Sequence, residues 1–98
     1  MRTSVLTQTA KDDLERIALF LEETQSSRTK IISFLNAFSE RLLRLEQIPF
    51  MYQASDKDPD VRRCLIHQNA ACFYRVTDTL VIILSIVDTR MNPDASLF

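Results

Sequence analysis

Apolar residues in the first quarter of the chain recur at i, i+3, i+4 and i+7: Leu14, Ile17, Ala18 and Leu21. This spacing predicts an amphipathic helix over about residues 8–24. Thr7 or Thr9 can cap its N-terminus, and Thr9 with Asp12 approximates a capping box. Residues 3–6, just before the helix, are short and β-branched in character, which predicts a first strand.

A second apolar stripe repeats at steps of four and three residues: Ile31, Leu35, Phe38, Leu42 and Leu45. It predicts a second helix, which Ser26 or Ser27 can cap. The dipeptide Ile48-Pro49 ends this helix, because a residue before proline avoids the α region. Since few residues join the two helices, we expect an antiparallel helical hairpin, followed by a polar loop over residues 50–60.

The rest of the chain predicts three antiparallel strands, over residues 61–67, 70–76 and 80–87. The gaps between them have the length of hairpin turns. Such turns usually need a residue with positive φ, and without glycine the next-best residues are asparagine and aspartate. Asn69 and Asp78 stand at those places, so we expect them to carry the turns.

The third of these strands is apolar on both faces apart from Ser85, which indicates a central strand covered on both sides. The helical hairpin can cover one face, and a partner or the C-terminal tail is needed for the other. Together the elements predict an α+β fold in a single domain over residues 1–98. In this fold an N-terminal strand and an α-helical hairpin pack on one face of a small, mainly antiparallel β-sheet (β-α-α-β-β-β).

Composition excludes several kinds of site. The 98 residues contain no glycine, two cysteines and one histidine. P-loops, dinucleotide-binding fingerprints and kinase glycine loops bend around phosphates through glycines, so all three are excluded. One histidine and two cysteines do not fill a tetrahedral zinc site without carboxylates. We therefore expect no cofactor and no metal, and a function carried by surface side chains or by a partner.

The charge balance is nearly even, with a net charge of −1. A dedicated nucleic-acid binder usually shows a basic excess, so nucleic acid is a poor candidate for the main partner. The longest apolar run, residues 80–84, is too short to span a bilayer, and the N-terminus lacks the apolar core of a signal peptide. The sequence thus predicts a cytoplasmic protein without a membrane partner, in which Cys64 and Cys72 are free thiols.

Five segments resemble, in order, the RelE/ParE superfamily of bacterial toxins from type II toxin–antitoxin modules: residues 6–17, 42–49, 61–63, 73–76 and 83–93. They are similar to the family's opening strand and first helix, the end of its second helix, the entry to its second strand, and its last two strands with the motif beyond them. The resemblance implies the family's fold, growth inhibition, and a role in plasmid stabilisation. It also implies a cognate antitoxin that wraps the sheet and helices, and contact with DNA through that antitoxin, as a heterotetramer or with the toxin as a homodimer.

The superfamily contains two chemistries. RelE-like members cleave mRNA on the ribosome, whereas ParE-like members poison DNA gyrase and have no nuclease activity. Arg90 matches one arginine of the nucleases, but Ala71 stands where they place another, and their C-terminal tyrosine falls near Ser96. RNA cleavage needs a base, an acid and positive charge on the phosphate, and no obvious group here supplies the acid and the base. The resemblance therefore favours a gyrase poison over a ribosome-dependent mRNA endonuclease or a non-toxic binding module, and leaves open whether the chain is an enzyme.

The candidate target-binding residues are Arg90, Arg62, Arg63 and Tyr74, and these four with His67 are the weak candidates for catalysis. Arg90 follows the central strand, where it can reach a target or phosphate, or pair with Asp88. Arg62 and Arg63 are adjacent on a strand and point to opposite faces, so at most one of them faces a given site.

The remaining candidates each have a structural alternative. The arginine of the 62–63 pair that faces away from the site is expected to be solvated or to pair with Asp58 or Asp60. His67 can act as a base, but at a hairpin end it is more typical of a solvated turn residue. Tyr74 can donate its hydroxyl, although a strand tyrosine is more often half-buried packing.

Overall fold

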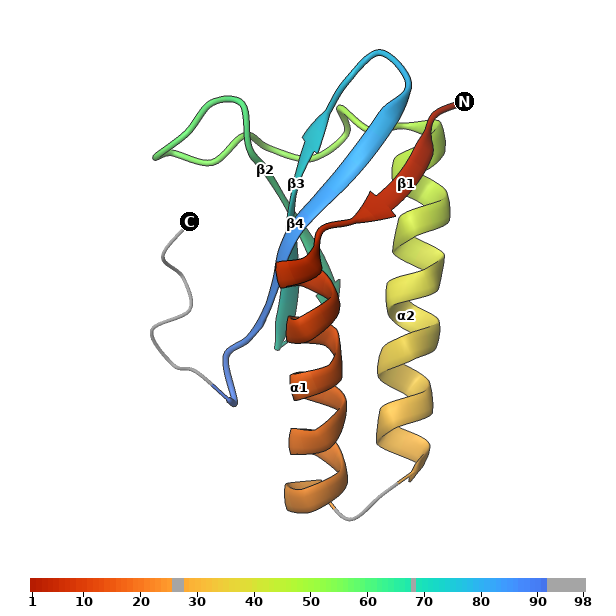
Figure 1. Cartoon of the computed structure of the whole chain (residues 1–98), viewed down its shortest axis with the longest axis vertical. Helices are drawn as coiled ribbons and strands as arrows, with labels where there is room; N and C mark the ends of the chain where they lie inside the picture. The colour runs from red at the N-terminus through yellow and green to blue at the C-terminus, as the bar shows by residue number, and fades with distance from the viewer. Residues whose placement is uncertain (26–27, 68, 92–98) are drawn as a thin grey trace.

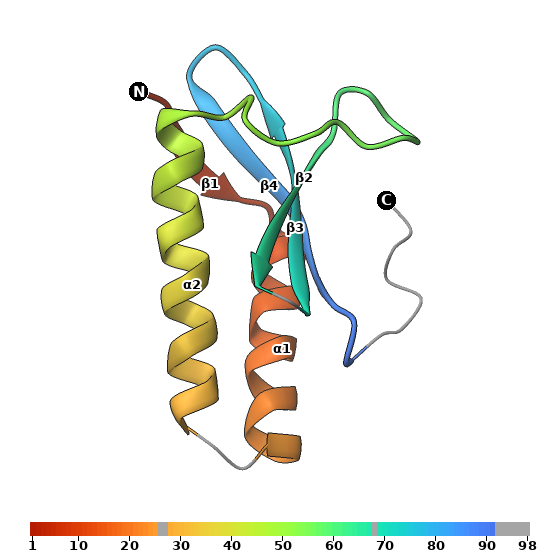
Figure 2. The ribbon, with the colours of Figure 1, turned by 180° about the vertical axis from the view of Figure 1, so that it is seen from behind.

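The computed structural model describes residues 1–25, 28–67 and 69–91. Six elements follow one another: β1 (Thr3–Leu6), α1 (Gln8–Gln25), α2 (Arg28–Gln47), β2 (Arg62–His67), β3 (Ala70–Val76) and β4 (Leu80–Asp88). This is the predicted β-α-α-β-β-β order, with element bounds close to the predicted ones. The two helices run side by side in both views of the ribbon (Figures 1 and 2), as the predicted hairpin requires.

The sheet has four strands in the order β1-β4-β3-β2. β4 runs parallel to β1 and antiparallel to β3, which is antiparallel to β2. The predicted central place of the most apolar strand is confirmed, since β4 lies between β1 and β3. Both helices pack on one face of the sheet, α1 over β4 and α2 over β2, which confirms the predicted α+β architecture.

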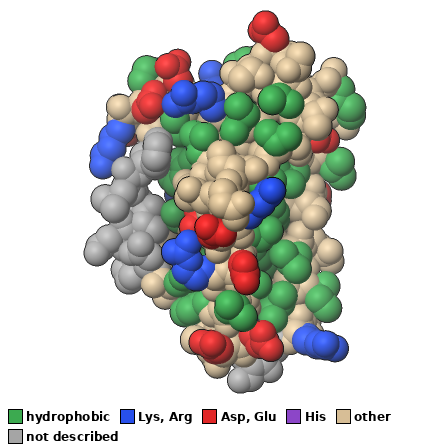
Figure 3. Space-filling model, in the orientation of Figure 1, with side chains coloured by type: hydrophobic (Ala, Val, Ile, Leu, Met, Phe, Trp, Pro, Cys, Tyr) green, Lys and Arg blue, Asp and Glu red, His purple; other side chains and the backbone are tan. Residues whose placement is uncertain are grey.

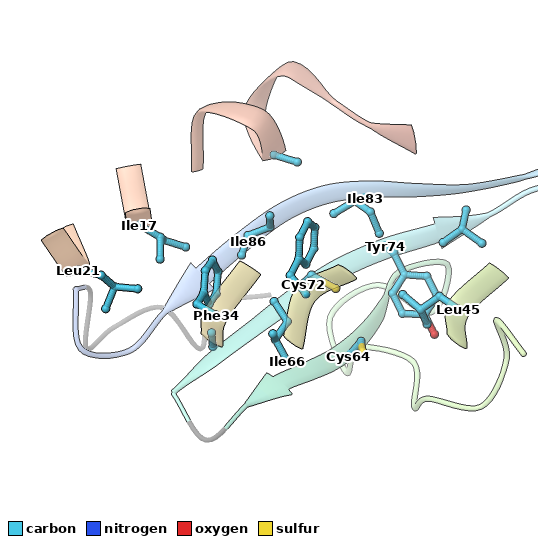
Figure 4. Packing of buried hydrophobic residues seen from close by; sticks show 14 residues of the cluster. Ile17, Leu21, Phe34, Leu45, Cys64, Ile66, Cys72, Tyr74, Ile83 and Ile86 are labelled. Carbon is cyan, nitrogen blue, oxygen red and sulfur yellow. The ribbon is translucent and has the colours of Figure 1, made fainter. Parts of the chain in front are cut away.

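The core fills the space between the helical hairpin and the sheet (Figure 4). Apolar side chains at most 4% exposed meet there from both layers: Ile17, Leu21, Phe34, Phe38, Leu45, Cys64, Ile66, Cys72, Tyr74, Val81, Ile83 and Ile86. Burying one large side chain of this kind stabilises the fold by roughly 1.5–3 kcal/mol. The helical stripes read from the sequence therefore supply one wall of the core, and alternate positions of the strands supply the other.

Thr7, the residue between β1 and α1, bonds to β4 just beyond the end of the β1–β4 pairing. The Thr7 amide donates to the Ile83 carbonyl at 3.0 Å, and the Thr7 hydroxyl donates to the Leu84 carbonyl at 2.9 Å. Thr7 Oγ1 also accepts the Ala10 amide at 3.1 Å, the bond expected of an N-cap. Thr7 is thus the cap of α1, and the alternative of Thr9 is wrong; Ser26 and Ser27, the predicted caps of α2, lie outside the described residues.

Both edges of the sheet are partly covered. At β1, Glu46 of α2 accepts the Ser4 amide at 2.8 Å and the Ser4 hydroxyl at 2.9 Å, and these bonds lower the pKa of Glu46. At β2, the Arg63 amide donates to the Gln53 carbonyl at 3.2 Å, and Arg41 Nε donates to the Leu65 carbonyl at 3.1 Å. Covered edges of this kind oppose strand-to-strand aggregation.

The β3–β4 turn is closed by Thr77. Its amide donates to the Leu80 carbonyl at 2.9 Å, and its hydroxyl oxygen accepts the Leu80 amide at 2.9 Å. In the β2–β3 turn the Asn69 carbonyl accepts the Thr89 amide at 2.8 Å, while Gln68 lies outside the described residues. The positive φ expected of Asn69 and Asp78 stays a prediction.

Candidate functional site

Arg90 lies at the end of β4 and is held by Asp88. Its Nε and Nη2 donate to the two carboxylate oxygens at 3.1 and 2.7 Å, and its backbone amide donates to Oδ1 at 2.9 Å. The Asp88 side chain is fully buried, whereas that of Arg90 is 28% exposed. Burial alone would raise the pKa of Asp88, but the hydrogen bonds from Arg90 outweigh it and hold the pKa below its ordinary value. The pair with Asp88 considered from the sequence is thus present, and it neutralises much of the Arg90 charge.

His67 and Arg90 line one cleft of about 450 Å³ between α2 and the β2–β3 turn. Lys30, Phe34 and Asn69 line the same cleft. The edge of the His67 ring meets the Phe34 ring, with centroids 5.6 Å apart and planes at 77°, and its Nδ1 accepts the Asn69 amide at 3.3 Å. His67 is therefore packed against Phe34 on one side and partly exposed in the cleft, at the hairpin end where a solvated residue was expected.

The cleft favours the neutral form of His67. Burial is the main cause that lowers the pKa of His67 below its ordinary value, and the nearby Arg90 guanidinium lowers it further. A neutral imidazole can accept a proton. Lys30 and Ser33 line the same cleft, so an ammonium group and a hydroxyl lie in one cleft with this imidazole.

Arg62 belongs to a separate cluster near the β3–β4 turn. Its guanidinium lies over the Phe50 ring at 5.0 Å from the centroid, and Arg2 lies over the same ring at 5.3 Å. Arg62 Nη1 also donates to the Tyr52 carbonyl at 2.6 Å. Phe50 itself is 57% exposed, so this cluster presents cations and an aromatic ring together, the composition found in binding hot spots.

Arg63 lies on the opposite side of β2 from Arg62, and Tyr74 is the register partner of Arg62 on β3. Arg63 is exposed, which agrees with the expected solvated arginine of the 62–63 pair, and Asp58 pairs with Arg75 at 3.6 Å. Tyr74 is fully buried, and its hydroxyl donates to the Pro49 carbonyl at 2.6 Å. Burial raises the pKa of Tyr74, so its phenol stays protonated and joins β3 to the end of α2.

The structure thus brings His67 and Arg90 together in one cleft, and it pairs Arg62 with Tyr74 across β2 and β3 at a separate place. Sequence reasoning missed Lys30, because a lysine on the polar side of a helix carries no signal of a cleft. It also missed Phe50, for which a large aromatic residue in an otherwise polar loop was the available signal. Asp60, the other partner considered from the sequence, lines one pocket of about 220 Å³ together with Arg62.

Two further properties concern the described residues alone. Within residues 1–25, 28–67 and 69–91, no group of three or more His, Cys, Asp and Glu side chains could hold a metal ion. Over that same part of the chain, neither helix combines the length and apolar character needed to cross a membrane.

Solved structures of toxin–antitoxin systems share the fold of this chain. A helical hairpin on one face of a four-stranded mixed sheet also occurs in the "Chromosomal ParDE TA system from P. aeruginosa", which matches with a TM-score of 0.75 and 21% identity over 90% of this chain and 96% of that one. The toxin–antitoxin complex RelBE2 from Mycobacterium tuberculosis matches with a TM-score of 0.64 and 21% identity, over 89% and 96% of the two chains. The DinJ-YafQ complex of E. coli matches with a TM-score of 0.61 and 10% identity, over 93% and 96%.

The family follows from the sequence profile. The model described as "ParE toxin of type II toxin-antitoxin system, parDE" matches residues 5–93, and no match is found among curated protein sequences. The chain therefore belongs to the ParE toxin family of type II toxin–antitoxin systems. This confirms the resemblance to the RelE/ParE superfamily seen in the sequence.

Proposed function

We propose that the chain inhibits growth by binding DNA gyrase, and that a cognate antitoxin neutralises it. The observation that carries the choice of gyrase over RNA is the pairing of Arg90 with the buried carboxylate of Asp88 at 2.7 Å. Arg90 matches an arginine of the mRNA-cleaving relatives, but its charge is compensated here. A compensated guanidinium is a poor stabiliser for the additional negative charge of a phosphoryl transition state.

Two further positions, Ala71 and Tyr74, also favour gyrase binding over RNA cleavage. Ala71, which stands where the nucleases place a second arginine, is 2% exposed and has no polar group. The Tyr74 hydroxyl is used inside the core by the Pro49 carbonyl. These two positions therefore add neither a cation nor a proton donor, and binding explains the toxin better than catalysis does.

The antitoxin is proposed to dock on the outer side of α2. Ile32, Leu35 and Leu43 lie at helical spacing on this helix and are 55%, 37% and 59% exposed. In Figure 3 hydrophobic side chains are visible along both helices. An apolar stripe on the outside of a helix fits the apolar face of an amphipathic segment. An antitoxin segment that covers this stripe would keep the toxin soluble. That an antitoxin is the partner is supported by two of the matching solved structures, which are described as a ParDE system and a RelBE2 toxin–antitoxin complex.

Two assays on the purified chain test the target. The proposal expects inhibition of gyrase supercoiling and no ribosome-dependent cuts by primer extension in a translation extract. Cuts without gyrase inhibition would refute the proposal and indicate an mRNA endonuclease. If neither effect is seen and cells grow normally on overexpression, the chain is a non-toxic binding module instead.

A pair of variants tests the antitoxin surface. Leu43→Glu places a charge on the apolar stripe, and Thr9→Glu places the same charge on an exposed position of α1. Growth arrest should persist for both when the toxin is expressed alone, but coexpressed antitoxin should rescue Thr9→Glu and fail to rescue Leu43→Glu. Equal rescue of the two variants would contradict docking on α2.

A further inference from the structure

Two buried cysteines face each other across the β2–β3 hairpin. Cys64 of β2 and Cys72 of β3 are directly paired in the strand register. Both thiols are free, both residues are 0% exposed, and both belong to the core cluster shown in Figure 4. Two cysteines are therefore placed opposite each other on the same face of the sheet, at the strand that lies on its edge.

The backbone bonds around the pair show which kind of strand pair the two cysteines occupy. The Arg63 amide donates to Gln53 and the Val61 carbonyl accepts from Ser55, so the backbone groups of residues 61 and 63 point away from β3. Because these directions alternate along a strand, the backbone of Cys64 points toward β3 and forms a hydrogen-bonded pair with Cys72. Such pairs have Cα atoms about 5.5 Å apart, inside the Cα range of disulfides, but their Cβ atoms are also about 5.5 Å apart, beyond the roughly 3.5–4.5 Å that a disulfide spans. Closing the bond therefore requires the edge strand β2 to draw toward β3 at this pair.

The surroundings distinguish the two thiols. The Cys64 thiol donates to the Leu65 carbonyl at 3.7 Å. Hydrogen bonding with the Cys72 thiol is the main cause that lowers the pKa of Cys64; burial opposes it, and Tyr52, Arg41 and Arg44 lower it further. The pKa of Cys72 is raised, first because its S–H is committed to Cys64 and then because it is buried. Cys64 also lies on the edge strand β2, whereas Cys72 lies on β3 between two strands, so local opening of the edge exposes the Cys64 sulfur first.

We propose that Cys64 and Cys72 form a peroxide-sensitive clasp that locks the edge strand β2 to β3. The Cys64 thiolate attacks hydrogen peroxide, so that an S–O bond forms, the O–O bond breaks, and the released hydroxide takes a proton to become water. Cys72 then attacks the Cys64 sulfenic acid, an S–S bond forms, and the departing hydroxide leaves as water with the Cys72 proton. In total the two thiols lose two electrons and two protons, and peroxide is reduced to two waters.

Peroxide is the class of oxidant that suits this site. It is about as small as water, whereas a bulky disulfide such as oxidised glutathione must approach a sulfur that is fully covered. β2 has one strand neighbour and an outer edge held by loop 53–55 and Arg41, so local opening of this edge can admit peroxide. Once closed, the bond stops that opening and stabilises the oxidised toxin. This proposal is independent of the target of the toxin.

The test uses the purified full chain, treated with hydrogen peroxide and then with N-ethylmaleimide. The proposal expects a loss of two hydrogen atoms in the intact mass, a linked Cys64–Cys72 peptide after proteolysis, reversal by dithiothreitol, and a Tm raised by about 5–10 °C. Alkylation of both thiols, an intermolecular dimer, or an oxidised protein with an unchanged or lower Tm would each overturn it.

Single alanine variants separate the two roles. In Cys72→Ala the remaining Cys64 should gain oxygen and form sulfenic or sulfinic acid, because no resolving thiol is present. In Cys64→Ala the remaining Cys72 should stay alkylatable after the same treatment. Equal oxidation of the two variants would contradict the assignment of nucleophile and resolving thiol, and the measurements on the wild-type chain test the bond itself if either variant fails to fold.

Discussion

A single carboxylate, that of Asp13, joins α1 to the middle of the sheet. Its Oδ2 accepts the backbone amide of Ile86 at 3.0 Å, and its Oδ1 accepts Nη2 of Arg16 at 3.0 Å. β1 pairs with β4 over residues 80–83, so at Ile86 the helix takes the place of the missing strand neighbour. Replacing Asp13 by alanine leaves this amide without its acceptor, in a region where α1 limits access of water.

The loss of stability in Asp13→Ala follows from the strength of the hydrogen bond that the Asp13 carboxylate accepts. A hydrogen bond to a charged group contributes about 1.5–3 kcal/mol, and the ion pair with the exposed Arg16 side chain adds about 0.5 kcal/mol or less. Asp13→Ala should therefore lower the free energy of unfolding by about 2–3 kcal/mol. Asp13→Asn should lower it by about 1 kcal/mol, because the amide oxygen still accepts from Ile86. For a domain of this size, 1 kcal/mol corresponds to roughly 4–8 °C in Tm, so Asp13→Ala should lose about 10 °C or more.

Thermal unfolding followed by circular dichroism measures this effect. Asp12→Ala is the matched control, since Asp12 is the adjacent aspartate of the same helix turn but is exposed and accepts from Gln8 at 2.9 Å on the solvent side. Its Tm should stay within a few degrees of wild type. Equal losses of Tm in Asp13→Ala and Asp12→Ala would refute the role of the carboxylate at β4.

Three further predictions concern the core, a turn and the cleft. Tyr74→Phe should cost about 1–2 kcal/mol in urea unfolding, because the buried Pro49 carbonyl loses its donor; an unchanged midpoint would contradict this. Asn69→Gly should be neutral or stabilising and Asn69→Val destabilising in the same assay if this turn residue has positive φ, and the reverse order would exclude it. His67 should titrate by NMR below its ordinary pKa of 6.5, because burial and then Arg90 disfavour its charged form. The unfolded state then binds the extra proton first, so stability should fall as pH drops below about 6.5, and Arg90→Gln should raise the pKa of His67.

Local patterns were enough to predict the elements of this fold. The stripes of α1 and α2 and the apolar run of β4 lie within single segments, where side-chain spacing reflects the period of a helix or a strand. The cap of α1 shows the limit of such patterns. Thr7 and Thr9 are equally good caps by residue type, and the choice of Thr7 depends on its bond to Leu84 of β4, 77 residues away.

The candidate site was predictable in part. Arg90 and its alternative partner Asp88 are two residues apart, so their pairing could be considered from the sequence. The neighbourhood of His67 could not, because Phe34 and Lys30 reach the same cleft from α2. The stacking of Arg62 on Phe50 could not be predicted either, because it depends on the loop after α2 returning beside β2.

By itself, the sequence determined the type and order of the elements, the family, and the exclusion of glycine-dependent nucleotide sites, because each of these depends on residue types and spacings within short segments. The tertiary structure alone decided that Asp13 accepts the Ile86 amide of β4, that His67 and Arg90 share a cleft, and that Cys64 faces Cys72. These are contacts between segments whose relative positions are set by packing of the helical hairpin on the sheet and by strand register. A shift of one residue in register would move every side chain of a strand to the opposite face, and no local pattern specifies which residues then meet.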